Sequence, residues 1–169
     1  TLRKGIEKSR NLMTVRIAQK FGFNKISKIS KDLGIYDNVP ELLSVSLGSN
    51  ETTLLNLTNA YCIFINGGKK VKPILISRIQ DRRGKTIFNS EKRNCKSCDK
   101  INLQEDITPE ILNASDQVIS KETAYQITSM LEGVVKRGTG KKLKNLNLPI
   151  AGKTGTTNDN FDAWFIGST

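Results

Sequence analysis

The residues best suited to chemistry are Lys153-Thr154-Gly155-Thr156, in a stretch where two apolar segments flank a polar turn. That pattern predicts a β-hairpin, whose first strand carries Lys and Thr where a buried strand would carry Val or Ile. Lys153 supplies a positive charge, and the absent side chains of Gly152 and Gly155 leave room for a ligand against the backbone. We expect an extended anionic substrate here, with Lys153 and threonine hydroxyls on its carboxylate and a backbone N–H near Thr156 facing a developing oxyanion.

A second polar pair, Ser9 and Asn11 in Ser9-Arg10-Asn11, lies near the other end of the chain. By themselves these residues could simply cap a helix, and Gly-Lys-Thr-Gly could be a surface turn. Ser-x-Asn followed by Lys-Thr-Gly is, however, the motif pair of the penicillin-recognising serine enzymes, in that order. Further segments look like the transpeptidase domain of class A penicillin-binding proteins, namely 2–12, 54–61, 66–68 and 137–140. The resemblance covers nearly the whole chain.

The resemblance implies an α+β fold in which helices pack on an antiparallel sheet, and the segregated helical and strand patterns favour the same class. It implies a peptidoglycan D,D-transpeptidase that cross-links stem peptides through an acyl-serine intermediate and is stalled by β-lactams. Ser9 would relay protons to the leaving nitrogen, Asn11 would bind the substrate amide and Lys153 would orient Ser9. The substrate-binding residues would be Thr154, Gly155 and Thr156.

The family's third motif, Ser-x-x-Lys, carries the nucleophile and should precede Ser9, but the first eight residues contain no serine. We therefore expect residues 1–169 to be a partial, inactive transpeptidase domain. Two alternatives stay open: a β-lactamase or β-lactam sensor domain, and a catalytically dead remnant that binds wall peptide. A missing part of the domain would expose apolar surface, so self-association of the chain is also expected.

Composition limits the partners and the location. The 169 residues are 37% hydrophobic, enough for one core, and no apolar run approaches the roughly 18 residues of a membrane span. The resemblance implies an upstream membrane anchor and a position on the periplasmic face of the bacterial inner membrane. Although the formal charge is +11, Lys and Arg are spread along the chain with few aromatics between them, so we expect a solvated surface and no nucleic-acid partner.

Three cysteines and the absence of histidine argue against a zinc site or other cofactor. Cys95 and Cys98 more plausibly form a local disulfide than a redox-active pair, and Cys62 is expected to be a small buried apolar residue. Cys95 and Cys98 fall within a Lys-rich segment, 89–108, which we expect to be a surface loop.

Periodicity places the remaining elements. Helical patterns cover 2–21, with a break near Ser9, and then a short helix capped by Asn24. A helix follows Thr52 or Thr53, and another follows Ser120 and ends at Gly138. The buried side of the first is expected to carry Leu54, Leu57, Ala60, Tyr61, Phe64 and Ile65. Strands are expected over 71–80 and 85–88 around a turn at 81–84, whereas 39–48 is expected to be extended or looped.

Overall fold

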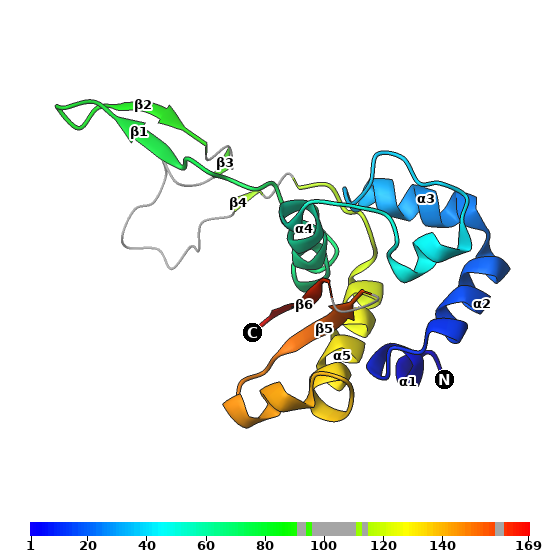
Figure 1. Cartoon of the computed structure of the whole chain (residues 1–169). Helices are drawn as coiled ribbons and strands as arrows, with labels where there is room; N and C mark the ends of the chain where they lie inside the picture. The colour runs from blue at the N-terminus through cyan, green and yellow to red at the C-terminus, as the bar shows by residue number, and fades with distance from the viewer. Residues whose placement is uncertain (91–93, 96–110, 113–114, 158–160) are drawn as a thin grey trace. The chain divides into compact units, whose positions relative to one another are not determined.

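The structure is a computed structural model that describes residues 1–90, 94–95, 111–112, 115–157 and 161–169. Within it the chain divides into two compact units, Thr1–Val71 with Gln117–Thr169 and Lys72–Asp116. The first unit holds the two motifs and most of the secondary structure (Figure 1). Its elements are α1 (Leu2–Glu7), α2 (Asn11–Phe21), α3 (Phe23–Asp32), η1 (Leu43–Leu47), α4 (Leu54–Ile65), α5 (Lys121–Arg137), η3 (Lys141–Leu146), β5 (Ala151–Thr156) and β6 (Ala163–Ser168).

The predicted hairpin is present at the end of the chain. β5 and β6 pair antiparallel, with Lys153 opposite Ile166 and Thr156 opposite Ala163. The strands are covered by α5, which packs against β5, and by α4, which contacts β6 (Figure 1). The mixed helix and strand architecture expected from the sequence is thus confirmed, and the Lys-Thr-Gly motif lies on a strand supported by the longest helix.

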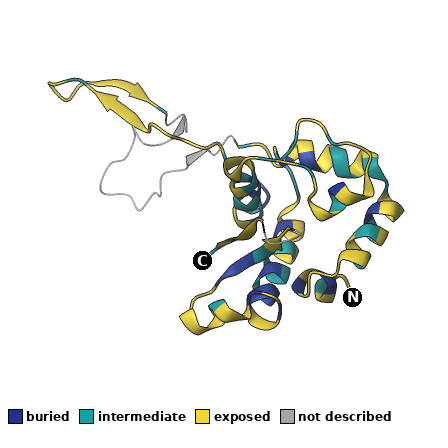
Figure 2. Ribbon diagram, in the orientation of Figure 1, coloured by how far each residue is buried: buried dark blue, intermediate teal, exposed yellow. Residues whose placement is uncertain are grey.

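α5 has the ends that its sequence predicts. The Ser120 side chain accepts a hydrogen bond from the backbone N–H of Thr123 at 3.2 Å, and Gly138 follows the last helical residue. The buried face of the helix includes Ala124, Leu131, Val134 and Val135, seen as dark blue on α5 in Figure 2. Because one face is apolar at helical spacing, α5 can pack against β5, α1 and α4 at once.

The predicted break in the first helical stretch lies at Ser9, between α1 and α2. Ser9 has φ of +51°, a left-handed conformation that is uncommon for residues other than glycine. The next prediction was wrong in detail: Asn24 is the second residue of α3, whose N-cap is Gly22. Gly22 has φ of +83°, and that backbone reversal separates α2 from α3, so capping by Asn24 is not needed.

α4 starts as predicted, because the Thr53 side chain accepts from the backbone N–H of Asn56 at 3.1 Å. Its buried face agrees with the prediction in part: Ala60 is buried as predicted, together with Ile63 and Leu33 in a core cluster against which Phe64 packs. Leu54 and Ile65 are about half exposed, at 53% and 48%. The sequence shows that the helix is apolar on most sides, and packing against Leu33, α5 and β6 decides which side is covered.

Segment 39–48 contains the short 3-10 helix η1 where the sequence predicted an extended or looped path. The prediction missed it because a single 3-10 turn leaves no periodic apolar pattern. Gly48, with φ of +90°, ends the element. No helix in the described ranges is long and apolar enough to span a membrane.

The second unit contains β1 (Arg78–Gln80) paired with β2 (Thr86–Asn89), and β3 (Asn94–Cys95) paired with β4 (Ile111–Leu112), both antiparallel. The turn at 81–84 is confirmed: Asp81 Oδ1 accepts from the N–H groups of Arg83 and Lys85 at 2.8 and 2.9 Å. The first strand is shorter than predicted, since pairing begins only at Arg78; Pro73 lacks the N–H that a ladder needs. Most of the predicted 89–108 loop lies outside the described residues, so it stays a prediction.

Candidate active site

Ser9 and Lys153 meet although 144 positions separate them. The Lys153 ammonium donates a hydrogen bond to Ser9 Oγ at 3.0 Å. Ser9 comes from the turn between α1 and α2, and Lys153 is the third residue of β5. The structure therefore brings together one residue from each of the two motifs that the sequence singled out.

The environment of Lys153 favours reactivity. Its ammonium donates a second hydrogen bond to the backbone carbonyl of Thr154 at 2.8 Å. Both acceptors are neutral oxygens, and partial burial lowers the pKa of Lys153 below its ordinary value because it removes water from the charged form. A half-buried cation held by neutral groups can attract an anionic ligand or exchange a proton with the neighbouring Ser9 hydroxyl.

Thr139 is a site residue that sequence reasoning did not select. Its hydroxyl oxygen lies 2.6 Å from that of Thr154, and either can be the donor. Thr139 follows α5 in the glycine-rich segment 137–140, which the sequence analysis identified only as part of the family resemblance. The sequence feature that could have identified Thr139 is its position between Gly138 and Gly140, because glycines mark places where backbones approach closely.

The other predicted site residues lie near this group in the fold but make no side-chain contact with it that the structure records. Asn11 is exposed as the first residue of α2, two positions after Ser9. Thr156 is exposed at the end of β5, and a side chain added at Gly155 would meet open space. The roles of Asn11, Gly155 and Thr156 toward a ligand therefore stay predictions.

The ligand role expected of Gly152 was wrong. A Cβ on Gly152 would lie 2.3 Å from Cζ of Phe165 and 2.6 Å from the carbonyl oxygen of Ile166. Gly152 is buried, and the space of its missing side chain is filled by β6 rather than left open. Of the two glycines of β5, Gly155 is the exposed one, with nothing within 4 Å of an added Cβ.

Of the three cysteines, the structure describes the side chain of Cys62 alone. Cys62 is a free, half-buried thiol in α4, less buried than expected. The backbone of Cys95 belongs to β3, but its side chain and all of Cys98 lie outside the described residues, so their disulfide stays a prediction. Across the described ranges, no cluster of His, Cys, Asp and Glu could hold a metal ion.

Comparisons with known proteins agree on one family. Residues 1–168 match the family model for the penicillin binding protein transpeptidase domain. The chain is 47% identical to penicillin-binding protein 1A of Rickettsia bellii over its whole length, but spans only 22% of that relative. Among solved structures, penicillin-binding protein 1A from Haemophilus influenzae matches with a TM-score of 0.81 and 30% identity, over 99% of this chain and 28% of that one.

A more distant structure has the same fold. Penicillin-binding protein A from M. tuberculosis, solved as an imipenem acyl-enzyme complex, matches with a TM-score of 0.71 and 20% identity. The match covers 99% of this chain and 38% of that one. At this identity the likeness concerns the fold alone.

Proposed function

This chain belongs to the family of penicillin-binding protein transpeptidase domains, and from that premise we propose that it forms one wall of the active-site cleft of a peptidoglycan D,D-transpeptidase. The 3.0 Å contact between Lys153 Nζ and Ser9 Oγ carries the proposal. It unites the Ser-x-Asn and Lys-Thr-Gly motifs, which a purely structural role would have no reason to join. The reaction is the cross-linking of stem peptides, on the periplasmic face of the inner membrane in a membrane-anchored protein.

In this reaction a serine hydroxyl attacks the carbonyl of the penultimate D-alanine, and the C–N bond to the terminal D-alanine breaks. Ser9 delivers a proton to the leaving amine, and Lys153 orients Ser9 and returns a proton to it. The proton released by the attacking hydroxyl replaces the one that Lys153 gave. An amine of a neighbouring stem peptide then attacks the acyl-serine ester, releases the serine and completes the cross-link. Splitting the exchange in this way replaces one difficult step by two easier ones.

The remaining motif residues bind and polarise the substrate. Asn11 holds its amide, and the hydroxyls of Thr154 and Thr156 hold its terminal carboxylate beside the positive charge of Lys153. The backbone N–H of Thr156 completes an oxyanion hole, where losing one donor typically costs about 3 kcal/mol of barrier. β-Lactams would enter by the same contacts, since they carry a carboxylate and an acyl group in a similar arrangement.

The nucleophile is proposed to come from sequence outside this chain. No serine precedes Ser9. Ser97-Cys98-Asp99-Lys100 has the Ser-x-x-Lys spelling but follows Ser9, against the family order, and lies outside the described residues. The 169-residue chain alone should therefore bind substrate without forming an acyl adduct. An adduct in its intact mass after incubation with penicillin would contradict this.

A fluorescent penicillin tests the function in the protein expressed from the complete reading frame. We expect covalent labelling on serine, lost in Lys153→Ala and kept in Lys144→Ala, a matched control because Lys144 is an exposed lysine of η3. A folded wild-type protein that does not label would refute the transpeptidase and favour a wall-peptide-binding remnant. Rapid hydrolysis of a chromogenic cephalosporin would favour a β-lactamase instead.

A further inference from the structure

The turn that carries Ser9 is held in an unfavourable backbone conformation. Ser9 has φ of +51°, in the left-handed region that is unfavourable for a residue with a side chain. Such a conformation persists only where the surroundings determine it, and it clusters at functional sites. The contacts of the two residues before Ser9 therefore hold its conformation.

Those contacts come from the end of α5. The Arg137 guanidinium donates to both carboxylate oxygens of Glu7, through Nη2 to Oε1 and through Nε to Oε2, the latter at 3.3 Å. The backbone N–H of Thr139 donates to the Glu7 carbonyl at 3.1 Å, and Lys8 Nζ donates to the Arg137 carbonyl at 2.7 Å. The two residues preceding Ser9 are thus tied to residues 137–139 by their side chains and by the backbone.

Two glycines of α5 and its end make room for this contact. A Cβ on Gly133 would lie 2.1 Å from Glu7 Oε1, and one on Gly138 would lie 2.1 Å from the Glu7 carbonyl oxygen. Glu7 is 6% exposed, and a charged side chain buried to that degree needs a partner. The Arg137 guanidinium beside Glu7 lowers the pKa of that carboxyl, so it stays ionised at neutral pH.

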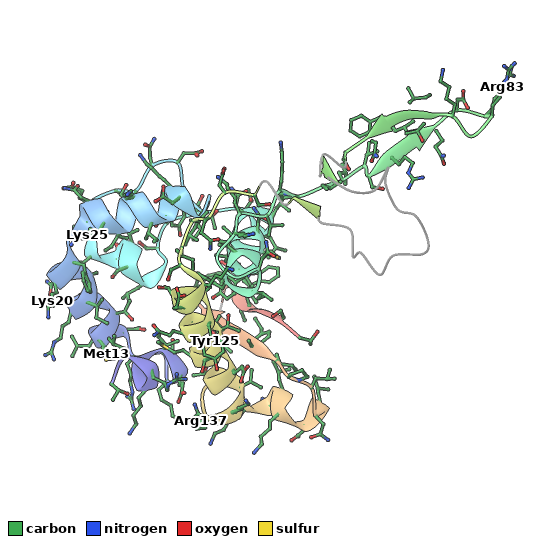
Figure 3. The ribbon with its side chains drawn as sticks, turned by 180° about the vertical axis from the view of Figure 1, so that it is seen from behind. Met13, Lys20, Lys25, Arg83, Tyr125 and Arg137 are labelled. Carbon is green, nitrogen blue, oxygen red and sulfur yellow. The ribbon has the colours of Figure 1, made fainter. Side chains whose placement is uncertain are left out.

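The same segment touches the other half of the site. Thr139, two residues after Arg137, has its hydroxyl 2.6 Å from that of Thr154, the neighbour of Lys153. Figures 1 and 3 show α1 beside the C-terminal part of α5, and Figure 3 labels Arg137 at that end of the helix. Residues 137–139 therefore contact the element that carries Ser9 and the strand that carries Lys153.

We propose that Glu7 and Arg137 are positioning residues whose bidentate ion pair fixes the Ser9 turn on the end of α5 and so sets the contact between Ser9 and Lys153. This inference rests on the proposed function and names a pair that acts through Ser9, without touching substrate. A second ion pair on α5, Lys136 with Glu132, is an i,i+4 pair with side chains 58% and 40% exposed. It has no contact with the Ser9 turn among those recorded, which makes Glu132→Gln a matched control.

The experiment uses the protein from the complete reading frame and four variants. They are Glu7→Gln, Arg137→Gln, the double variant and the control Glu132→Gln. Two quantities are measured for fluorescent penicillin, the fraction of molecules that label and the second-order rate constant of acylation. A third measurement, trace acetylation across pH with peptide mass spectrometry, gives the pKa of Lys153 independently of any acyl-enzyme chemistry.

We expect both single variants to label completely but with a rate constant reduced roughly 10-fold to 100-fold, the loss typical of a catalytic group misplaced by about 1 Å. The double variant should be no slower than the slower single variant, because either change already breaks the pair. The pKa of Lys153 should rise toward its ordinary value as the displaced turn admits water. Glu132→Gln should match the wild type in all three measurements.

A purely structural role gives a different pattern, a smaller labelled fraction in which the remaining molecules acylate at the wild-type rate. That pattern, or an unchanged rate constant in both single variants, would overturn the positioning role while leaving the transpeptidase assignment intact. If the wild type itself does not label, the proposed function is wrong. The positioning role is then tested by the pKa of Lys153 alone, and an unchanged pKa of Lys153 in Arg137→Gln would overturn it. Glu7→Gln is the variant less prone to misfolding, because it leaves the 55% exposed Arg137 side chain in water, whereas Arg137→Gln leaves the buried Glu7 carboxylate without its partner.

Discussion

Replacing each of the two glycines of β5 by alanine should separate a structural glycine from one that leaves space for a ligand. Gly152 is enclosed by β6, with the Ile166 carbonyl oxygen 2.6 Å and the Gly167 Cα 2.9 Å from the place of a new Cβ. The Phe165 ring could rotate away, but the two backbone atoms cannot move without distorting the hairpin. A Cβ on Gly155 would meet nothing within 4 Å.

The expected magnitudes follow from these distances. Overpacking of this kind typically costs about 1–3 kcal/mol, so Gly152→Ala should lower the melting temperature by about 2–12 °C in a chain of this size. Gly155→Ala has no clash, and the smaller entropy of its unfolded chain should stabilise by up to about 1 kcal/mol. In the full-length protein, however, its methyl group would project from the same side of the strand as Lys153 and slow acylation by penicillin.

Thermal unfolding followed by circular dichroism compares the two variants with the wild-type chain, and fluorescent-penicillin labelling of the full-length protein measures acylation. The reasoning about Gly152 fails if Gly152→Ala melts with the wild type. The reasoning about Gly155 fails if Gly155→Ala is as unstable as Gly152→Ala, or if it labels at the wild-type rate.

Three further outcomes are expected. Ser120→Ala should lower the free energy of unfolding by about 1 kcal/mol in a denaturant titration, because the Thr123 N–H at the start of α5 loses its acceptor; an unchanged midpoint would contradict this. Because Arg137 lowers the pKa of Glu7 in the folded state, the stabilisation from this carboxylate is complete above the unfolded-state pKa of about 4.5 and is lost as the pH falls through the folded-state pKa. Glu7→Gln should remove this part of the pH dependence of the unfolding free energy; a loss of stability in acid identical to that of the wild type would be evidence against the ion pair. The isolated chain should self-associate through apolar side chains such as Trp164, which is 54% exposed, and light scattering after size exclusion should show more than the monomer mass; a sharp monomer peak would refute this.

Local rules predicted most of the helices and the hairpin. Thr53 and Ser120 cap their helices as expected because a cap depends on residues only two or three positions away. The hairpin of β5 and β6 was predictable for the same reason, since its two apolar segments and polar turn are adjacent in sequence. The errors concern features whose outcome depends on distant partners, such as the strand at 71–77 and the exposure of Leu54 and Ile65 on α4.

The family and the residue types of the site could be predicted without coordinates, because the spelling and order of Ser-x-Asn and Lys-Thr-Gly are properties of the chain alone. The fold was needed to place Lys153 Nζ 3.0 Å from Ser9 Oγ, to bring the Thr139 hydroxyl to that of Thr154, and to fill the space beside Gly152 with atoms of β6. The Glu7 and Arg137 pair, 130 positions apart, could not be predicted either. The physical reason is that these contacts depend on how α1 and β5 pack on α5, which local sequence does not specify.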